Sequence, residues 1–180
     1  MTDKMIASKE GRVGILTFNN PEKHNAVSFE MWEAAEKILT SFETDPEVRV
    51  VVLTGAGGKA FVSGADISKF ESERASEEAV QRYNEIVEKV YGRIYRFPKP
   101  TIAMVRGFCI FGGWMIASSM DLVFADDSAR FLASQFEYFS LPWDVGPKKA
   151  KELIFESRFI DAEEAMRYSF VNRIYPAADL

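Results

Sequence analysis

Short apolar runs alternate along the chain with longer segments in which apolar residues recur at helical spacing. The run 48–54 is nearly continuous and β-branched, which is typical of a strand covered on both faces. Similar runs predict strands at 13–18, 101–105 and 122–125. Residues 5–10 precede a turn at Gly11 and should pair with the first of these strands.

The helical pattern is clearest in two segments. After Ser28, a plausible N-cap, apolar residues recur at Trp32, Ala35, Leu39 and Phe42. A second long helix should open at Ser76, carry the apolar stripe 80–94 and end before the prolines at 98 and 100. Shorter helices are predicted at 114–120, 146–155 and 161–168, before an extended segment at 172–176. Strands alternating with crossover helices predict an α/β fold, and without a linker we expect one domain, 1–180.

Composition and charge narrow the class of protein. Apolar residues make up 47% of the 180 positions, enough for a core, and 22 basic against 27 acidic residues argue against a nucleic-acid partner. Cys109 and His24 are the only residues of their types, which argues against disulfides, metal centres and histidine relays. No apolar run approaches the roughly 18 residues that a membrane span needs, and residues 1–10 do not resemble a signal peptide. We expect a soluble, cytoplasmic protein without a metal or a membrane partner.

Two glycine-bearing turns are the candidate chemistry. FVSGADI at 61–67 and GFCIFGGW at 107–114 each follow a buried run and lead toward a helix. Turns at the carboxyl ends of parallel strands are where α/β proteins bind ligands, and free N–H groups at a helix start are preorganised for a developing oxyanion. The alternative is that these glycines only permit tight turns.

A family resemblance joins these features. The stretches that carry it are ILTFNNPEKHNAVS, VVLTGAGGKAFVSGADI, KPTIAMVRGFCIFGGWMIASSMDLVFADDSARF and IDAEEAMRYSFVNRIYPAADL. In order and spacing they resemble the crotonase (enoyl-CoA hydratase/isomerase) superfamily across essentially the whole chain. The resemblance implies a spiral of ββα units and a substrate carried as a coenzyme A thioester. It also implies a homo-oligomer, either a trimer or a hexamer, and no separate cofactor, since coenzyme A is part of the substrate.

Matched residue by residue, the family's two oxyanion-hole N–H donors fall on Ala65 and Gly112. A thioester enolate carries its charge on one oxygen, and two fixed donors meet that charge in the transition state. The implied substrate-binding positions are Lys23, Asn25, Ala26, Lys59, Ser63, Ala65, Asp66, Ile67, Gly112, Met115 and Gln135. Lys23 and Lys59 could instead be solvated surface charges, and Asp66 could be a structural residue at a helix start.

The chain also departs from the family. The two glutamates of typical hydratases are replaced by Met115 and Gln135, which cannot act as acid or base near neutral pH. Glu137 and Tyr138 are candidate replacements, with a solvated loop as the alternative. Asp144 is a third candidate, although it could simply cap the helix near Gly146.

Further differences lie at Phe111, where the family has the first glycine of its turn, and at the end of the chain. Relatives usually continue past the position of Leu180 into C-terminal helices. If the protein ends at Leu180, we expect exposed apolar surface, at Phe155 and Phe170 for example, and weakened assembly.

Three hypotheses remain open. The first is an acyl-CoA lyase or isomerase of the hydratase type, or a divergent hydrolase or decarboxylase, that uses Ala65 and Gly112. The second is a non-catalytic acyl-CoA-binding or assembly protein of the same fold. The third, a nucleotide-binding α/β domain, finds no glycine-rich nucleotide motif in the sequence.

Overall fold

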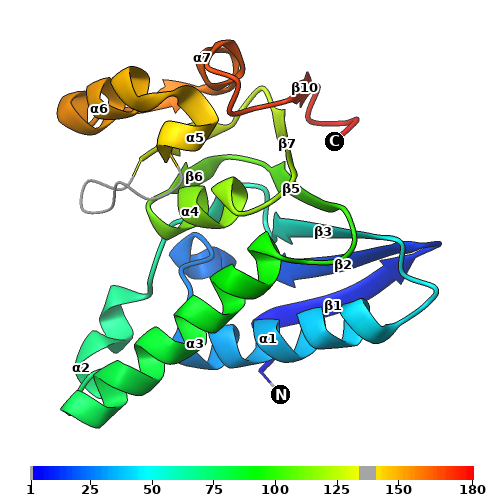
Figure 1. Ribbon diagram of the computed structural model, residues 1–180, viewed down its shortest axis with the longest axis vertical. Coiled ribbons are helices and arrows are strands. Elements are labelled where there is room, and N and C mark those ends of the chain that lie inside the picture. Colours follow the sequence, from blue (N-terminus) through cyan, green and yellow to red (C-terminus); the bar gives the residue numbers. More distant parts are fainter. Residues whose placement is uncertain (1, 134–140) are drawn as a thin grey trace.

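The computed structural model describes residues 2–133 and 141–180 and contains two β-sheets (Figure 1). The larger sheet has the strand order β1-β2-β3-β5-β7-β10. Its strands are β1 (Met5–Glu10), β2 (Val13–Phe18), β3 (Val50–Gly55), β5 (Thr101–Val105), β7 (Leu122–Asp126) and β10 (Arg173–Tyr175). Only the β1–β2 pair is antiparallel. The strands predicted from the apolar runs are confirmed.

The smaller sheet was not predicted. Its strands, in the order β4-β6-β8-β9, are β4 (Ala60–Val62), β6 (Phe108–Ile110), β8 (Arg130–Leu132) and β9 (Ile160–Asp161). β4, β6 and β8 are parallel neighbours, and β9 is antiparallel to β8. Treating the whole of 61–67 and 107–114 as turns was therefore wrong, because each begins with residues of β4 or β6, and strands of three residues are too short to show an alternating pattern.

The two sheets are built together by a repeated unit. Each of β3, β5 and β7 is followed by a strand of the smaller sheet, β4, β6 or β8, and then by helix. The chain thus spirals between the sheets, and the predicted α/β spiral of ββα units is confirmed. The helical elements are η1 (Pro21–Lys23), α1 (Phe29–Thr44), η2 (Ile67–Lys69), α2 (Phe70–Glu73), α3 (Glu77–Tyr95), α4 (Gly112–Ser118), α5 (Leu141–Val145), α6 (Pro147–Glu156) and α7 (Ala162–Arg167).

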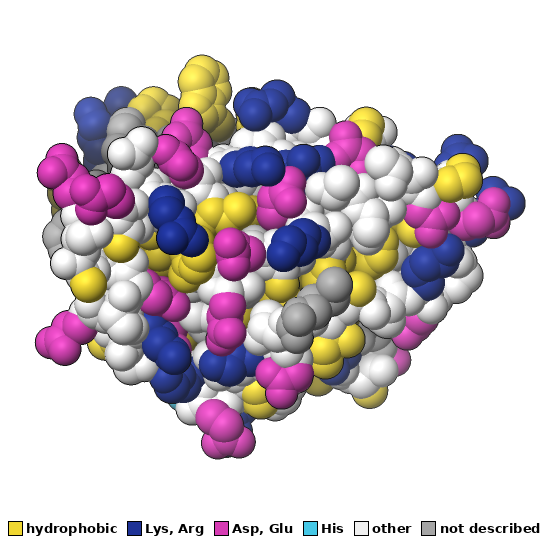
Figure 2. Space-filling model, turned by 90° about the horizontal axis from the view of Figure 1, so that it is seen from below, with side chains coloured by type: hydrophobic (Ala, Val, Ile, Leu, Met, Phe, Trp, Pro, Cys, Tyr) yellow, Lys and Arg dark blue, Asp and Glu magenta, His cyan; other side chains and the backbone are white. Residues whose placement is uncertain are grey.

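The two long helices, α1 and α3, pack on each other (Figure 1). α1 buries the predicted face, including Trp32 and Phe42. α3 begins directly after Ser76, as predicted, and the Ser76 hydroxyl caps it by accepting a hydrogen bond from the Ala79 N–H at 3.2 Å. Ser28 occupies the position before α1, as expected. Its side chain makes no capping hydrogen bond, so the expected capping by the hydroxyl is wrong. On the outer face of these helices, acidic and basic side chains are interspersed rather than segregated (Figure 2).

The C-terminal part corrects two expectations. Phe170 is only 4% exposed because its ring stacks on Trp114, with centroids 4.4 Å apart, whereas Phe155 is 80% exposed as expected. Asp144 lies within α5, and its carboxylate accepts a hydrogen bond from the Ser118 hydroxyl at 2.7 Å. It is therefore not the cap of α6, which begins after Gly146 without a side-chain cap.

Within the described part of the chain, no helix is both long and apolar enough to span a membrane.

Candidate active site

The two glycine turns predicted to carry the chemistry touch each other. They follow β4 and β6, and since these strands are parallel neighbours, their carboxyl ends lie side by side. A Cβ atom on Gly112 would lie 3.4 Å from the Gly64 Cα, which is ordinary van der Waals contact. Gly64 has a φ of 101°, a conformation that residues with a Cβ rarely adopt. Glycine at position 64 therefore permits the turn, and the two turns lie in contact.

Each turn has one N–H group available. Around Ala65, the N–H groups of Val27 and Asp66 donate to Gly64 O and Val27 O at 2.8 and 2.9 Å, which leaves the Ala65 N–H out of this pairing. Gly112 is the first residue of α4, where an N–H has no acceptor within the helix. Among the residues that the structure describes, neither N–H has a hydrogen-bond acceptor.

Ala65 and Gly112 line one cavity of about 450 Å³, which the side chains of α1, α3 and α4 help to enclose. Met115 also lines it, one turn of α4 beyond Gly112. Apolar side chains form much of the wall, among them Val27, Val62, Val87 and Ile116. The cavity thus combines two free backbone donors with a mainly apolar enclosure, which suits an acyl group next to a reactive carbonyl.

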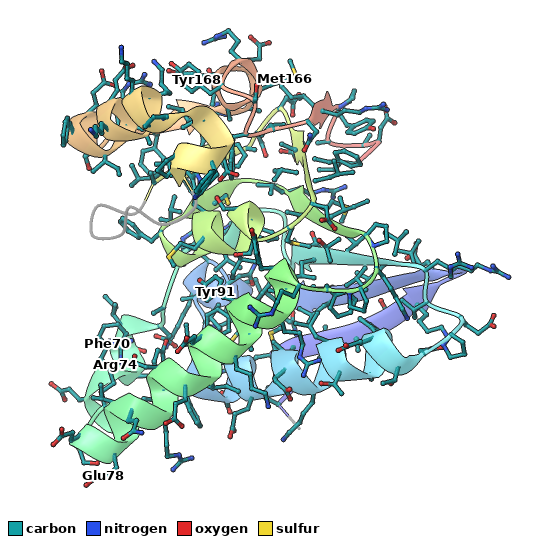
Figure 3. The ribbon with its side chains drawn as sticks, viewed as in Figure 1. Phe70, Arg74, Glu78, Tyr91, Met166 and Tyr168 are labelled. Atoms are coloured by element: carbon teal, nitrogen blue, oxygen red, sulfur yellow. The ribbon has the colours of Figure 1, made fainter. Side chains whose placement is uncertain are left out.

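Tyr91 connects α3 to the first turn of α4. Its hydroxyl donates a hydrogen bond to Gly112 O at 3.1 Å, and its ring packs against Trp32 with centroids 5.5 Å apart (Figure 3). This bond ties the first turn of α4, which carries the Gly112 N–H, to α3. Sequence analysis missed this residue, since Tyr91 lies beside the predicted apolar stripe of α3 and only its hydroxyl could have signalled a role.

Phe111 occupies a strained position just before this donor. Its backbone has φ 50° and ψ −115°, which a bulky residue adopts only at a cost of about 1–3 kcal/mol. Its side chain lines the cavity. Glycine, which the resemblance implies at this position, would adopt this backbone without strain, so Phe111 is a departure with a physical consequence.

Asp66 and Lys23 form an ion pair beside the first turn. Asp66 is buried and caps η2, accepting a hydrogen bond from the Ser68 N–H, and its carboxylate lies 3.0 Å from the Lys23 Nζ. Burial raises the pKa of Asp66, but the bonds from Ser68 and Lys23 outweigh it, so that the pKa lies below its ordinary value. The structural interpretation of Asp66 is confirmed.

Asn25 braces the loop before α1. It is fully buried, and its side-chain amide donates to the carbonyls of Ala60 and Ala56 at 2.7 and 3.0 Å. Its side-chain oxygen accepts from the Asn20 N–H at 2.9 Å. Several predicted binding positions do not belong to the described lining of the cavity: Lys23, Asn25, Ala26, Lys59, Ser63, Asp66 and Ile67.

Acid–base groups are scarce in the described lining. Its ionisable side chains are Arg74, Tyr83 and Tyr91, without a carboxylate. The expected replacements Glu137 and Tyr138, and the predicted binding residue Gln135, lie outside the described residues.

Two other candidate groups prove to be apart from the cavity. Cys109 is completely buried, and this burial raises the pKa of its thiol, so Cys109 is a core residue. Asp144 belongs to α5, which lies on the side of α4 away from α3 (Figure 1). Burial raises the pKa of its carboxyl group more than the hydrogen bond from Ser118 lowers it.

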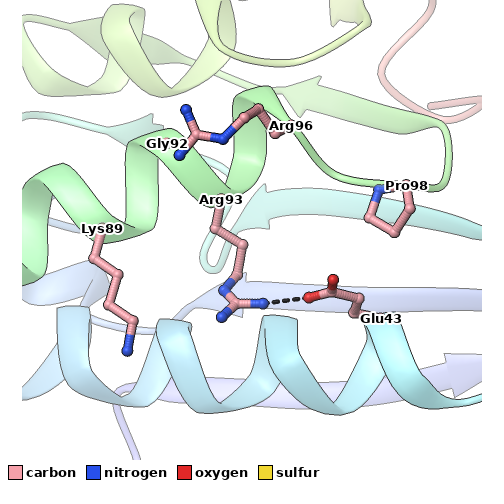
Figure 4. Close-up of a pocket in the computed structure, with 6 residues that line it drawn as sticks. All are labelled: Glu43, Lys89, Gly92, Arg93, Arg96 and Pro98. Atoms are coloured by element: carbon pink, nitrogen blue, oxygen red, sulfur yellow. Dashed lines mark hydrogen bonds and ion pairs between the residues drawn. The ribbon is translucent and has the colours of Figure 1, made fainter.

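A second cavity, of about 350 Å³, lies between α1 and α3 (Figure 4). Arg93 pairs there with Glu43 and, at 3.0 Å, with Glu36, which also pairs with Lys89 at 3.1 Å. Lys89 and Arg93 thus pair with glutamates of α1, and Arg96 adds a further cation to the lining. The ion pairs join α1 to α3.

The fold and the paired donor turns define a protein of the crotonase class. The sequence matches the enoyl-CoA hydratase/isomerase family over residues 8–180. The chain belongs to this family of acyl-CoA enzymes.

Individual relatives agree with this assignment. The chain is 38% identical to a putative enoyl-CoA hydratase of Thermus thermophilus, over 96% of this chain and 71% of the relative. It is 34% identical to a short-chain-enoyl-CoA hydratase of Clostridium acetobutylicum, over 99% and 71%. The crystal structure of an enoyl-CoA hydratase/carnithine racemase from Magnetospirillum magneticum superposes with a TM-score of 0.90 at 30% identity, over 99% of this chain and 70% of that one.

Proposed function

We propose that this chain binds an acyl-CoA thioester and stabilises its enolate with the N–H groups of Ala65 and Gly112. The observation that carries the proposal is that Ala65 and Gly112 line one cavity and that neither N–H has an acceptor among the described residues. An enolate oxygen between two preorganised donors gains stabilisation that the ground-state thioester does not receive to the same extent. Hydration or isomerisation of an enoyl thioester, as the names of the relatives suggest, is the chemistry that such a site serves.

The acid–base group of this reaction is also a proposal. Met115 cannot transfer a proton, so a protic group must come from elsewhere. We assign this role to Glu137 or Tyr138, because the described lining has no carboxylate. A divergent hydrolase or decarboxylase could use the same pair of N–H donors with a different proton donor.

A second candidate function is a non-catalytic acyl-CoA-binding protein, which the position of Met115 in the cavity favours. Two measurements on the native chain separate the candidates. Calorimetry should show tighter binding of crotonyl-CoA than of crotonate, and the absorbance of the enoyl thioester should then report turnover. Binding without turnover of crotonyl-CoA or longer enoyl-CoAs supports the non-catalytic protein, whereas equal affinity for crotonate and crotonyl-CoA contradicts both.

We further propose that the chain forms a homo-oligomer, a trimer or a hexamer, on the basis of the family resemblance. Exposed aromatic side chains such as Phe155 and Trp143 provide apolar surface for contact between copies. Sedimentation velocity over a range of concentrations tests this proposal, and a monomer at every concentration would contradict it.

A further inference from the structure

We propose that Arg74 forms an anion subsite at the far end of the acyl cavity, so that the preferred substrate is an acyl-CoA whose chain ends in a carboxylate. This inference rests on the proposed function and names the substrate class of the same site. It is drawn from the placement of one arginine relative to α3 and to the two donor turns.

The cavity extends along α3. Tyr83, Val87 and Tyr91 line it at successive turns of one face of α3. At 1.5 Å per residue, the eight residues from Tyr83 to Tyr91 span about 12 Å. Tyr91 marks the oxyanion end, because its hydroxyl bonds to Gly112 O. Tyr83 therefore marks a second end, separated from the reacting carbonyl by a distance typical of a medium-length acyl chain.

The guanidinium group of Arg74 lies at the Tyr83 end of the cavity. The guanidinium carbon of Arg74 lies 4.3 Å from the centre of the Tyr83 ring and 3.9 Å from that of Phe70. All three residues line the cavity. Figure 3 shows Phe70 and Arg74 near the beginning of α3, away from Tyr91. Arg74 is thus the only cationic side chain in the described lining.

The guanidinium group of Arg74 has no anionic partner among the described residues. No acidic side chain among the described residues pairs with it, and its Nε is buried without a hydrogen-bond partner. Its neighbour Glu73 accepts a hydrogen bond from the Phe29 N–H at 3.0 Å instead. By contrast, Arg93 and Arg158 pair with glutamates.

A guanidinium stacked on aromatic rings uses its face and keeps its N–H edge for hydrogen bonds. A carboxylate matches that edge with two parallel charge-assisted bonds, and it would satisfy donors that are otherwise half-buried and unpaired. Between Arg74 and the donor turns, the wall includes the apolar side chains of Val87 and Ile116, which suit the methylene groups of a chain. The cavity is therefore polar at both ends and apolar between them.

The test compares matched ligands that differ only at the end of the chain. Binding of hexanoyl-CoA and adipyl-CoA is measured by calorimetry on the full chain. One charge-assisted pair should favour adipyl-CoA by about tenfold to a hundredfold. The preference of succinyl-CoA over butyryl-CoA should be smaller, because the shorter chain does not reach Arg74.

Arg74→Met keeps an unbranched side chain of similar length and removes the charge. We expect it to reduce the preference for adipyl-CoA to about one, with the loss confined to that ligand. Arg82→Met is the matched control, because Arg82 stacks on Phe29 outside this cavity, and it should keep the native preference. Circular dichroism checks that both variants fold, and the comparison of ligands on the native chain needs no variant.

Equal affinity of the native chain for hexanoyl-CoA and adipyl-CoA overturns the inference while leaving the proposed function intact. Equal weakening of both ligands by Arg74→Met also overturns it, since Arg74 would then contact the shared coenzyme A. If none of the thioesters binds, the proposed function fails, and this inference fails with it.

Discussion

The N–H of Gly112 is the group on which the proposed chemistry depends most directly, and proline at this position removes it. Gly112 is the first residue of α4, the helix position that tolerates proline best, because no intrahelical hydrogen bond is lost there. Phe111 precedes it at φ 50° and ψ −115°, outside the helical region that proline disfavours in its predecessor but also outside the extended region that it favours. The bond from Tyr91 to Gly112 O uses the carbonyl and is retained. Gly112→Pro thus suits the start of the helix, whereas Phe111 has to adjust, and the folding of the variant is checked before its activity.

The expected loss follows from the number of donors. Two N–H groups face the enolate oxygen in the proposed site, and the variant keeps only that of Ala65. Loss of one such donor typically reduces turnover about 10²–10³-fold, or by roughly 3–4 kcal/mol of transition-state stabilisation. Affinity for the same thioester should fall much less, because the ground-state carbonyl gains less from the donor.

Gly112→Ala is the matched control. It keeps the N–H, and its Cβ would meet the Gly64 Cα at 3.4 Å and the Tyr91 hydroxyl oxygen at 3.5 Å, which is ordinary contact. Alanine at the next position is unsuitable, because a Cβ on Gly113 would lie 2.1 Å from Val62 O. A substitution there would disturb the packing of α4 on β4 whatever its effect on the donor.

The assay is turnover of the thioester that the native chain processes best, measured beside calorimetric affinity for the same ligand. Circular dichroism and thermal melting first show that each variant is folded. We expect turnover to decrease from the native chain to Gly112→Ala and then to Gly112→Pro. The large decrease should lie between the two variants. A folded Gly112→Pro variant with native turnover would refute the assignment of this N–H to the oxyanion hole.

Three further predictions concern neighbouring positions. Met115→Glu restores an acid–base group inside the cavity and should raise the weak crotonyl-CoA hydration that we expect of the native chain; vigorous native hydration would instead show that another group transfers the proton. Phe111→Gly should be more stable than Phe111→Ala by about 1 kcal/mol in urea unfolding, because glycine adopts positive φ without strain; equal stabilities would count against strain at this turn. Asp144 has a raised pKa, so its protonated form favours folding, and the contribution of this group to stability should fall as pH rises from about 4 through the folded-state value. Asp144→Asn removes this loss, so its advantage in unfolding free energy should be greater at pH 7 than at pH 3.5, and an advantage independent of pH would contradict the reasoning.

Sequence periodicity was sufficient for the larger sheet and the long helices. Strands such as β2 and β3 and helices such as α1 and α3 extend over enough residues for an apolar pattern to repeat. The Ser76 cap was also readable, because a capping hydroxyl acts on an N–H only three residues away. These features depend on local chemistry, which the order of residues contains.

The relative position of the two N–H donors could not be predicted from local chemistry alone. The motifs around Ala65 and Gly112 were visible in the sequence, but their meeting depends on the parallel pairing of β4 and β6, which are distant in the chain. Strands of three residues show no pattern of their own, and their pairing is decided by the spiral as a whole.

Burial and unpaired charge were likewise decided by tertiary contacts. Phe170 was expected to be exposed, yet Trp114 covers its ring. Nothing local to Arg74 indicates that Tyr83 will stack on its guanidinium group, or that no described carboxylate will reach it. The sequence thus determined which chemical groups were available, whereas the neighbours of each group, and with them its exposure and pairing, depend on contacts between segments that only the folded chain brings together.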